Sequence, residues 1–318
     1  MLFLNKDAIQ KIDQNSIQTA VEQAYRLVLS QNYNMPDRMH VADNQNILLL
    51  MPCFSEKFFS TKLVSVFPEA QQHGQPAVNG VMVLSDNVSG QPLAVMDGAA
   101  VTAQRTGAVG GLGVKLLTPE TVRAAGVLGA GVQGLSQARY LLFNRKIKTL
   151  YIYDLYKESA INMTRVLKKE YPDVDYVITE NANQLVENSS VIIAATTSSN
   201  PLFETTPDGV MGKIFISIGS FRPDMQEFPD TVIETADDVF VDTLFAAKES
   251  GDIATPLKKH VITKNKIKEF AGLLGKNTYP ENRTVFFKSV GMALFDLTVS
   301  SAIYQLAVKN NIGQALDF

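Results

Sequence analysis

A glycine-rich turn between an apolar strand and a helix limits the folds open to this chain more than any other segment. The turn follows the apolar run Ala124–Leu128 and opens a helical pattern over Val132–Asn144. Asp154 ends the next expected strand, 20 residues after the last glycine of the turn. This spacing is typical of a parallel dinucleotide-binding sheet. The six residues of the turn are Gly129, Ala130, Gly131, Val132, Gln133 and Gly134.

Each part of this pattern has a physical role toward a dinucleotide. The first glycine permits a tight turn, the second lets the backbone approach a pyrophosphate, and the third lets helix and strand pack closely. The helix N-terminus offers free amides to the phosphates. Asp154 is expected to bind the ribose hydroxyls and to repel a 2′-phosphate, which favours NADH, although Lys157 nearby keeps NADPH as the second option. The competing interpretation is a glycine-rich turn in an unrelated α/β sheet.

The pattern along the chain predicts two domains. Short apolar runs over 46–51, 60–66, 80–85 and 92–97 indicate an antiparallel meander after a helix over 6–30. From residue 123 strands and helices alternate, which predicts a doubly wound, Rossmann-type parallel sheet of the α/β class. A long apolar helix is expected over 284–309. We therefore expect a smaller α+β substrate-binding and dimerisation domain over 1–113 with 292–318, and an NAD(P)-binding domain over 114–291.

Composition narrows the function classes. The 318 residues carry 29 Lys+Arg and 32 Asp+Glu, a net charge of −3, so the chain has no general attraction for nucleic acid or an anionic membrane. No apolar run approaches the roughly 18 residues of a membrane span. One cysteine and three scattered histidines predict neither a disulfide framework nor a metal site. We expect a cytoplasmic enzyme with a small-molecule substrate.

Three cations are candidates for binding an anionic substrate. Arg38 precedes the meander, Lys62 interrupts an apolar run, and Arg105 lies in a segment of small residues that permits close approach. An arginine can hold a carboxylate bidentately, and a desolvated lysine can move protons. The competing interpretation of each is an ordinary surface cation. His40 and His73 have no catalytic motif beside them, and Cys53 is expected to be a buried structural thiol.

These segments together resemble the ornithine cyclodeaminase/mu-crystallin family over nearly the whole chain. The resemblance implies a homodimer in which Arg38, Lys62 and Arg105 bind the substrate carboxylate and surround the reacting carbon, with Lys62 and Arg105 as catalytic residues. It also places Ser289 and Gly291 near the nicotinamide. The segments that carry the resemblance are 37–38, 60–62, 102–108, 129–134, 218–227 and 285–291.

One departure from the family pattern bears on the reaction. Cyclodeaminases carry a catalytic aspartate after the glycine that ends a sheet strand, whereas this chain has Ser220 and Phe221 after Gly219. The resemblance therefore favours NAD(P)H-dependent reduction of a cyclic ketimine, Δ1-pyrroline-2-carboxylate to L-proline or Δ1-piperideine-2-carboxylate to L-pipecolate. The alternatives are ornithine cyclodeaminase, alanine dehydrogenase and a non-catalytic, mu-crystallin-like ligand-binding protein.

Overall fold

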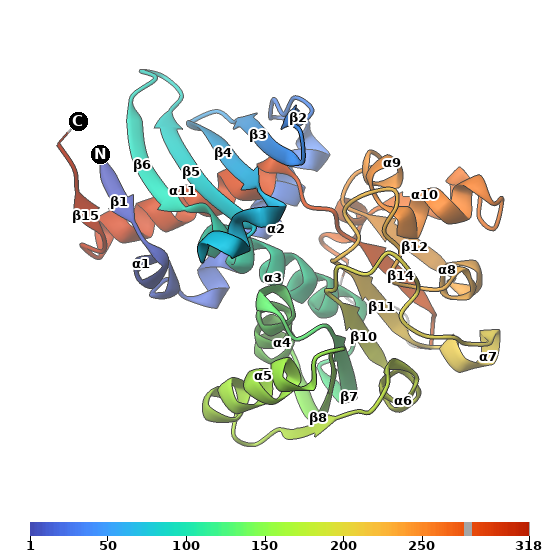
Figure 1. Cartoon of the computed structure of the whole chain (residues 1–318). Coiled ribbons are helices and arrows are strands. Elements are labelled where there is room, and N and C mark those ends of the chain that lie inside the picture. The colour runs from blue at the N-terminus through green and yellow to red at the C-terminus, as the bar shows by residue number, and fades with distance from the viewer. Residues whose placement is uncertain (277–281, 318) are drawn as a thin grey trace. The chain divides into compact units, whose positions relative to one another are not determined.

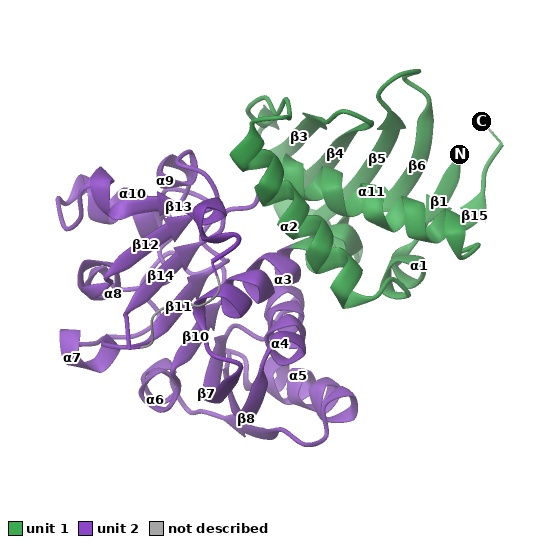
Figure 2. Cartoon of the chain, turned by 180° about the vertical axis from the view of Figure 1, so that it is seen from behind, with its two compact units in different colours: residues 1–105, 292–318 green, residues 106–291 purple. Residues whose placement is uncertain are grey.

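The computed structural model describes residues 1–276 and 282–317 and divides into two compact units (Figure 2). Unit 1 comprises Met1–Arg105 and Met292–Phe318, and unit 2 comprises Thr106–Gly291. The division falls inside helix α3 (Gly98–Leu117), upstream of the expected boundary at residue 113. The C-terminal segment therefore returns to the unit that the N-terminus begins.

Unit 1 is built on a seven-stranded sheet in the order β15-β1-β6-β5-β4-β3-β2 (Figure 1). Strands β2 to β6 form the expected antiparallel meander, and β1 adds to β6 in parallel. The elements are β1 (Leu2–Leu4), α1 (Lys6–Gln10), α2 (Gln14–Ser30), β2 (Met39–Asp43), β3 (Asn46–Phe54), β4 (Phe58–Val66), the 3-10 helix η1 (Pro68–His73), β5 (Val78–Asp86), β6 (Pro92–Asp97), the start of α3, α11 (Ala293–Lys309) and β15 (Gln314–Ala315).

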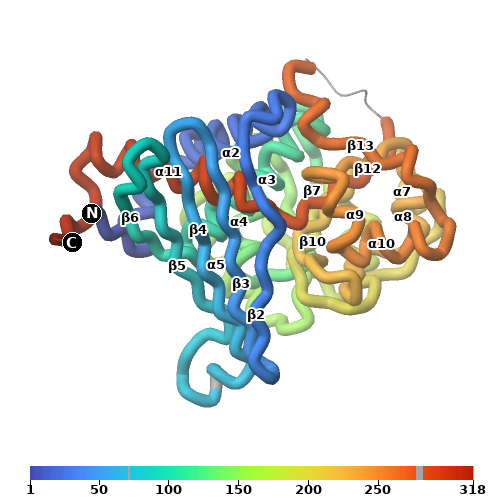
Figure 3. The backbone as a smooth tube through the Cα atoms, turned by 90° about the horizontal axis from the view of Figure 1, so that it is seen from above, coloured from blue at the N-terminus to red at the C-terminus, as the bar shows by residue number. Residues whose placement is uncertain are grey.

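The two faces of this sheet have different surroundings. Helix α11 packs on β3, β4 and β5 and against α2, and Figure 3 shows both helices on one side of the strands. The covered face carries a row of cross-strand partners in which one lysine stands among apolar side chains. The opposite face is also apolar, yet Met39, Val41 and Val81 on it are 44–55% exposed. The row on the covered face consists of Met51, Lys62, Met82, Met96 and Leu4, all buried.

Unit 2 contains an eight-stranded parallel sheet in the order β13-β12-β14-β11-β10-β7-β8-β9. The order reverses between β7 and β10, so the sheet is doubly wound and the predicted Rossmann-type fold is confirmed. The elements are β7 (Thr121–Leu128), α4 (Val132–Asn144), β8 (Lys146–Tyr153), α5 (Lys157–Glu170), β9 (Asp175–Ile178), α6 (Ala182–Asn188), β10 (Val191–Ala194), α7 (Pro207–Val210), β11 (Ile214–Ser217), α8 (Asp230–Thr235), β12 (Asp238–Val241), α9 (Ala246–Glu249), α10 (Gly251–Lys258), η2 (Lys264–Lys266), β13 (Ile267–Glu269), η3 (Phe270–Leu273) and β14 (Val285–Lys288).

Two predicted helices are wrong in part. The helix expected over 6–30 is two helices, because the Asp13 side chain accepts from Ser16 N and caps a new start at Gln14. The helix expected over 284–309 begins only at Ala293. Residues 285–288 form the central strand β14, and Gly291 has a φ of +74°, which a helix does not tolerate.

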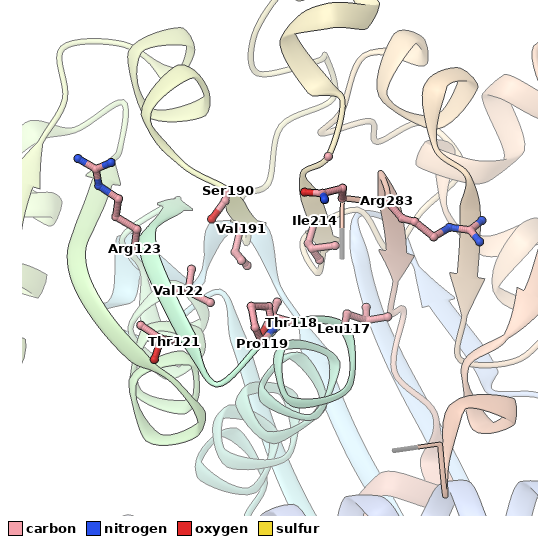
Figure 4. Close-up of a pocket in the computed structure, with 12 residues that line it drawn as sticks. Leu117, Thr118, Pro119, Thr121, Val122, Arg123, Ser190, Val191, Ile214 and Arg283 are labelled. Carbon is pink, nitrogen blue, oxygen red and sulfur yellow. The ribbon is translucent and has the colours of Figure 1, made fainter. Parts of the chain in front are cut away.

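A cavity of about 220 Å³ opens in unit 2 at the amino ends of β7, β10 and β11 (Figure 4). Figure 4 shows the guanidinium groups of Arg123 and Arg283 extending away from it, and Arg283 pairs with Asp238. Ligands of open α/β sheets bind at the carboxyl ends of the strands, so this cavity lies at the wrong edge for a dinucleotide.

In the described ranges, no helix combines the length and apolarity that crossing a membrane requires.

The start of α3 is fixed by a contact between two glycines. A Cβ on Gly98 would lie 2.6 Å from the carbonyl carbon of Gly80 in β5, and that backbone is held on both sides by strand pairing. We expect Gly98→Ala to lower the free energy of unfolding by about 2 kcal/mol, because the helix start must move off the sheet. Urea unfolding measures the change. The control Gly272→Ala, where a Cβ meets nothing within 4 Å, should leave stability unchanged; equal stability of both variants would contradict the prediction.

Candidate active site

The turn between β7 and α4 leaves room for a ligand at one glycine only. Gly129 has a φ of +94°, and a Cβ there would lie 2.7 Å from the carbonyl oxygen of Ala195 after β10. A Cβ on Gly134 would collide with the carbonyl oxygen of Gly129, whereas one on Gly131 meets nothing within 4 Å. Helix α4 begins at Val132 with no side-chain cap, so its first amides are available to an anion.

Asp154 connects this turn to the end of β8. Its Oδ2 accepts from Ala130 N at 2.7 Å, and its Oδ1 accepts from Tyr156 N at 2.8 Å. The carboxylate therefore lies beside the glycine turn, at the strand end where a ribose is bound in this fold. The open approach at Gly131, the uncapped helix and this carboxylate together fit the adenosine half of a dinucleotide.

A buried glutamate joins the loops that follow β10 and β11. Glu227 Oε1 accepts from the amide and hydroxyl of Thr196, at 2.7 and 2.9 Å, and Oε2 accepts from Gly219 N at 2.7 Å and Ser220 N at 3.1 Å. Ser217 Oγ, which ends β11, also lies 3.1 Å from Oε2. One fully buried carboxylate thus holds two adjacent loops at the carboxyl edge of the sheet.

Lys288 and Asp252 are linked to the Glu227 carboxylate through the hydroxyl of Ser217. Lys288 Nζ donates to Ser217 Oγ at 2.9 Å, and Ser217 Oγ lies 2.6 Å from Asp252 Oδ2. Burial raises the pKa of Asp252 to about 6, against the opposing effect of the Lys288 ammonium. Burial lowers the pKa of Lys288, and the carboxylates of Asp252, Glu227 and Asp242 oppose that shift. The group is a closed buried network and has no side chain exposed to a ligand.

The turn after β14, which contains the predicted cofactor residues Ser289 and Gly291, is held by Asp242. Its Oδ2 accepts from Ser289 Oγ at 2.8 Å, Val290 N at 3.1 Å and Gly291 N at 3.0 Å. Asp242 follows β12, the neighbour of β14. The Ser289 hydroxyl therefore supports the turn from inside, and the three amides of the turn are held by Asp242 and by the carbonyl oxygen of Ser217.

Unit 1 brings two of the three predicted substrate residues together on a third, unpredicted one. Lys62 Nζ lies 2.8 Å from Asp296 Oδ2, and Arg105 Nε lies 3.2 Å from Asp296 Oδ1. The three side chains come from β4, α3 and the first turn of α11, and all are buried. Two cations face one carboxylate, so this cluster has an excess positive charge that favours a bound anion.

Burial and neighbouring charges shift the acidity of Lys62. Burial lowers its pKa, the Asp296 carboxylate opposes that shift, and the positive charges of Arg105 and Arg38 add to it, so that the pKa falls from 10.5 to about 8. Arg38, in the segment before β2, is half-buried, and it lies close enough for its positive charge to lower the pKa of Lys62. Cys53 is buried as expected, and burial raises the pKa of its thiol to about 12, so it is not a nucleophile.

Sequence reasoning missed Asp296, Asp242 and the role of Glu227. A signal existed for Asp296, because it is the only charged residue between Lys288 and Lys309, in an otherwise apolar segment. A buried carboxylate in such a segment requires a cationic partner. Glu227 and Asp242 lie in ordinary loop contexts and carry no comparable signal.

At the position of the cyclodeaminase aspartate, this chain has a serine whose side chain forms structural hydrogen bonds. Ser220 is fully buried, donates to the carbonyl oxygen of Met225 at 2.6 Å, and shares a hydrogen bond with Ser250 Oγ at 2.8 Å. Asp224 forms an exposed ion pair with Arg222. Neither side chain is placed as a buried proton acceptor. Within 1–276 and 282–317, no three His, Cys, Asp or Glu side chains gather as a metal site.

Comparison with known sequences assigns the chain to a family. The sequence pattern of the ornithine cyclodeaminase/mu-crystallin family matches residues 2–311. The chain belongs to this family. The resemblance stated from the motifs is thereby confirmed.

Members of the family with assigned activities match nearly the full length. The chain is 32% identical to a Δ1-pyrroline-2-carboxylate reductase of Bacillus thuringiensis, over 87% of this chain and 86% of that protein. The reductase of the same name from Thermococcus litoralis, solved with NADH and L-proline, is 29% identical with a TM-score of 0.91, covering 99% and 100% of the two chains. An archaeal alanine dehydrogenase, solved as a dimer with NAD, is 26% identical with a TM-score of 0.90, covering 100% and 99%.

The Glu227 network generates a prediction on stability. Glu227→Gln places an amide NH₂ against backbone N–H donors, so at least one buried donor loses its acceptor. We expect the free energy of unfolding to fall by about 3 kcal/mol. Chemical unfolding measures it, with the exposed Glu234→Gln in α8 as the matched control. A loss no larger than that of the control would show that the network is not what holds the two loops.

Proposed function

We propose that the chain is an NADH-dependent reductase of a cyclic ketimine, converting Δ1-pyrroline-2-carboxylate to L-proline. The observation that carries the proposal is the buried Lys62–Asp296–Arg105 cluster, whose excess positive charge suits one carboxylate. The relatives that match nearly the whole chain support the substrate and the cofactor, since two are named for this reaction and one holds NADH with L-proline. The six-membered Δ1-piperideine-2-carboxylate is the alternative substrate of the same chemistry.

In this proposal the two units have separate tasks. The glycine turn and Asp154 bind the dinucleotide, whose reduced nicotinamide supplies the hydride. Arg105 and Arg38 hold the substrate carboxylate, because a guanidinium binds a carboxylate bidentately. The Lys62 ammonium donates a proton to the imine nitrogen, which makes the adjacent carbon a better hydride acceptor. Lys62 and Arg105 are the catalytic residues, and the turn at 289–291 contacts the nicotinamide through its backbone.

Two other reactions of the family are competing candidates. The similarity to an archaeal alanine dehydrogenase favours reductive amination of pyruvate as the second candidate. Cyclodeamination of ornithine is disfavoured, because Ser220 is turned into a buried hydrogen bond where that reaction needs a proton acceptor. A ligand-binding protein without turnover is disfavoured by the intact catalytic cations.

Dimerisation and compartment complete the proposal. The uncovered apolar face of the unit 1 sheet, which carries Met39, Val41 and Val81, is the proposed surface between two copies. A relative solved as a dimer supports it, and the mass of the protein in solution, measured by light scattering, tests it. A cytoplasmic location is proposed because NADH is supplied there and the single thiol of Cys53 is free.

The deciding experiment follows nicotinamide absorbance with purified protein and NADH. Δ1-Pyrroline-2-carboxylate should oxidise NADH with kcat/KM about 100-fold above that for pyruvate plus ammonia, because the preformed ring iminium avoids a separate condensation step. L-Ornithine with NAD should release no ammonia. Faster turnover of pyruvate would replace the proposal by alanine dehydrogenase. Ammonia from ornithine would restore cyclodeaminase, and binding without any turnover would indicate a ligand-binding protein.

The pKa of Lys62 predicts the pH dependence. A lysine that donates a proton is active while protonated. We therefore expect kcat/KM to be at its maximum below about pH 8 and to fall as the pH rises through that value. Lys62→Arg should lower kcat by about 100-fold and remove the alkaline fall, because a guanidinium stays protonated. The exposed Lys57→Arg is the control and should change neither. An alkaline fall that survives in Lys62→Arg would assign it to another group.

Asp154 predicts the cofactor preference. Asp154→Ala removes the charge that repels a 2′-phosphate and the bond to Ala130 N. We expect the ratio of kcat/KM for NADH over NADPH to fall about tenfold, as for the loss of a hydrogen bond to a charged group. The exposed Asp173→Ala should leave the ratio unchanged. Unaltered selectivity in Asp154→Ala would place the determinant elsewhere.

A further inference from the structure

We propose that Asp296 is a positioning residue that keeps Lys62 protonated and directed into the substrate site. This inference rests on the proposed function, because it concerns the proton that Lys62 donates. It also has a consequence for folding that does not depend on any substrate.

Among the residues that the structure describes, Asp296 is the acidic side chain that pairs with Lys62. Its cross-strand neighbours on the same face are Met51 and Met82, which offer no strong hydrogen-bond acceptor. Its side chain is 4% exposed, and that of Asp296 is 0% exposed. Asp296 comes from the first turn of α11, whose buried residues are otherwise apolar or hydroxyl-bearing. The 2.8 Å contact between Nζ and Oδ2 is therefore the ion pair on which the buried ammonium depends.

Three charged groups act on Lys62, and a neutral thiol lies on the neighbouring strand. Arg105 on α3 and Arg38 before β2 are positive, the Cys53 thiol on β3 is neutral, and Asp296 on α11 is negative. Burial and both arginines favour the neutral amine, and only the Asp296 carboxylate favours the ammonium. Without that carboxylate, the arginines that bind the substrate would also discharge the lysine that protonates it.

The proton step explains why the ammonium must be favoured. Lys62 gives one proton to the imine nitrogen, the C=N π electrons move to that nitrogen, and hydride from NADH forms the new C–H bond. The products are the cyclic amino acid, NAD and a neutral Lys62, which regains a proton from water. Asp296 favours that return. Since a carboxylate repels the substrate carboxylate, Asp296 acts through Lys62 and is not a substrate ligand.

Asp296→Asn tests this inference, because it preserves the size of the side chain and removes the charge. We expect kcat to fall about 10- to 100-fold while KM changes less than about threefold, because the arginines still hold the carboxylate. The alkaline fall of kcat/KM should move from about pH 8 to lower pH, because the carboxylate that raises the pKa of Lys62 is gone. Calorimetric titration with pyrrole-2-carboxylate, a planar mimic of the substrate, should show undiminished binding.

Ser300→Ala is the matched control. Ser300 is fully buried on the same helix and donates only to the carbonyl oxygen of Leu297. It should leave kcat and the pH profile unchanged. Equal losses of kcat and of binding of the mimic in Asp296→Asn, with the alkaline fall still near pH 8, would overturn the inference and make Asp296 a packing residue.

A second variant keeps the inference testable where Asp296→Asn folds poorly. In Lys62→Met/Asp296→Asn the ammonium is gone, and Met suits the row of methionines on that face. We expect the double variant to unfold at a higher temperature than Asp296→Asn, since the uncompensated ammonium is what destabilises the single variant. A melting temperature that is not recovered would overturn the inference. If wild type reduces no imine, the proposed function fails, while this coupling still shows whether Asp296 acts on Lys62.

Discussion

The arrangement of unit 1 depends on the buried ion cluster of Lys62, Asp296 and Arg105, because the three side chains must be brought together for their charges to be compensated. Removing charged groups from water costs several kcal/mol for each ion, and a buried pair that loses one partner is strongly destabilised. The cluster therefore couples three segments that are far apart in sequence: β4, the start of α3, and α11 near the C-terminus. The chain must return from unit 2 to bring Asp296 to the sheet. The close approach of Gly98 to Gly80 fixes the start of the helix that carries Arg105.

Both units use buried carboxylates to hold the groups that we propose as ligand contacts. In unit 2, Glu227 joins the loops after β10 and β11, and Asp242 joins the turn after β14 to β12. In unit 1, Asp296 holds two cations. None of the three carboxylates is exposed. Such support fixes loop and side-chain positions before a ligand arrives, so that binding does not have to order them.

The sequence allowed prediction of those features that depend on local spacing. The turn at 129–134 and Asp154 could be placed because a strand, a glycine pattern and an acidic residue follow one another at fixed distances. Lys62 could be expected to point inward because it interrupts an apolar run. Asp296 could not be assigned, because its partners lie more than 190 and more than 230 residues away in sequence, and only tertiary structure shows the pairing. The helix expected over 284–309 was wrong over 284–292 because apolar composition does not distinguish a buried strand such as β14 from a buried helix.

The acidity of Lys62 connects the architecture to the direction of the reaction. Reduction of an imine consumes a proton, and the reverse oxidation of an amine releases one. With its pKa lowered to about 8, Lys62 is mostly an ammonium at neutral pH and is an acid suited to reduction. Above that pH the same side chain becomes a neutral amine and can accept the proton that oxidation releases. Ser220 stands where cyclodeaminases carry their aspartate, and its hydroxyl is held in a buried hydrogen bond. In the proposed reaction one lysine therefore serves both directions, and the pH sets which of its forms prevails.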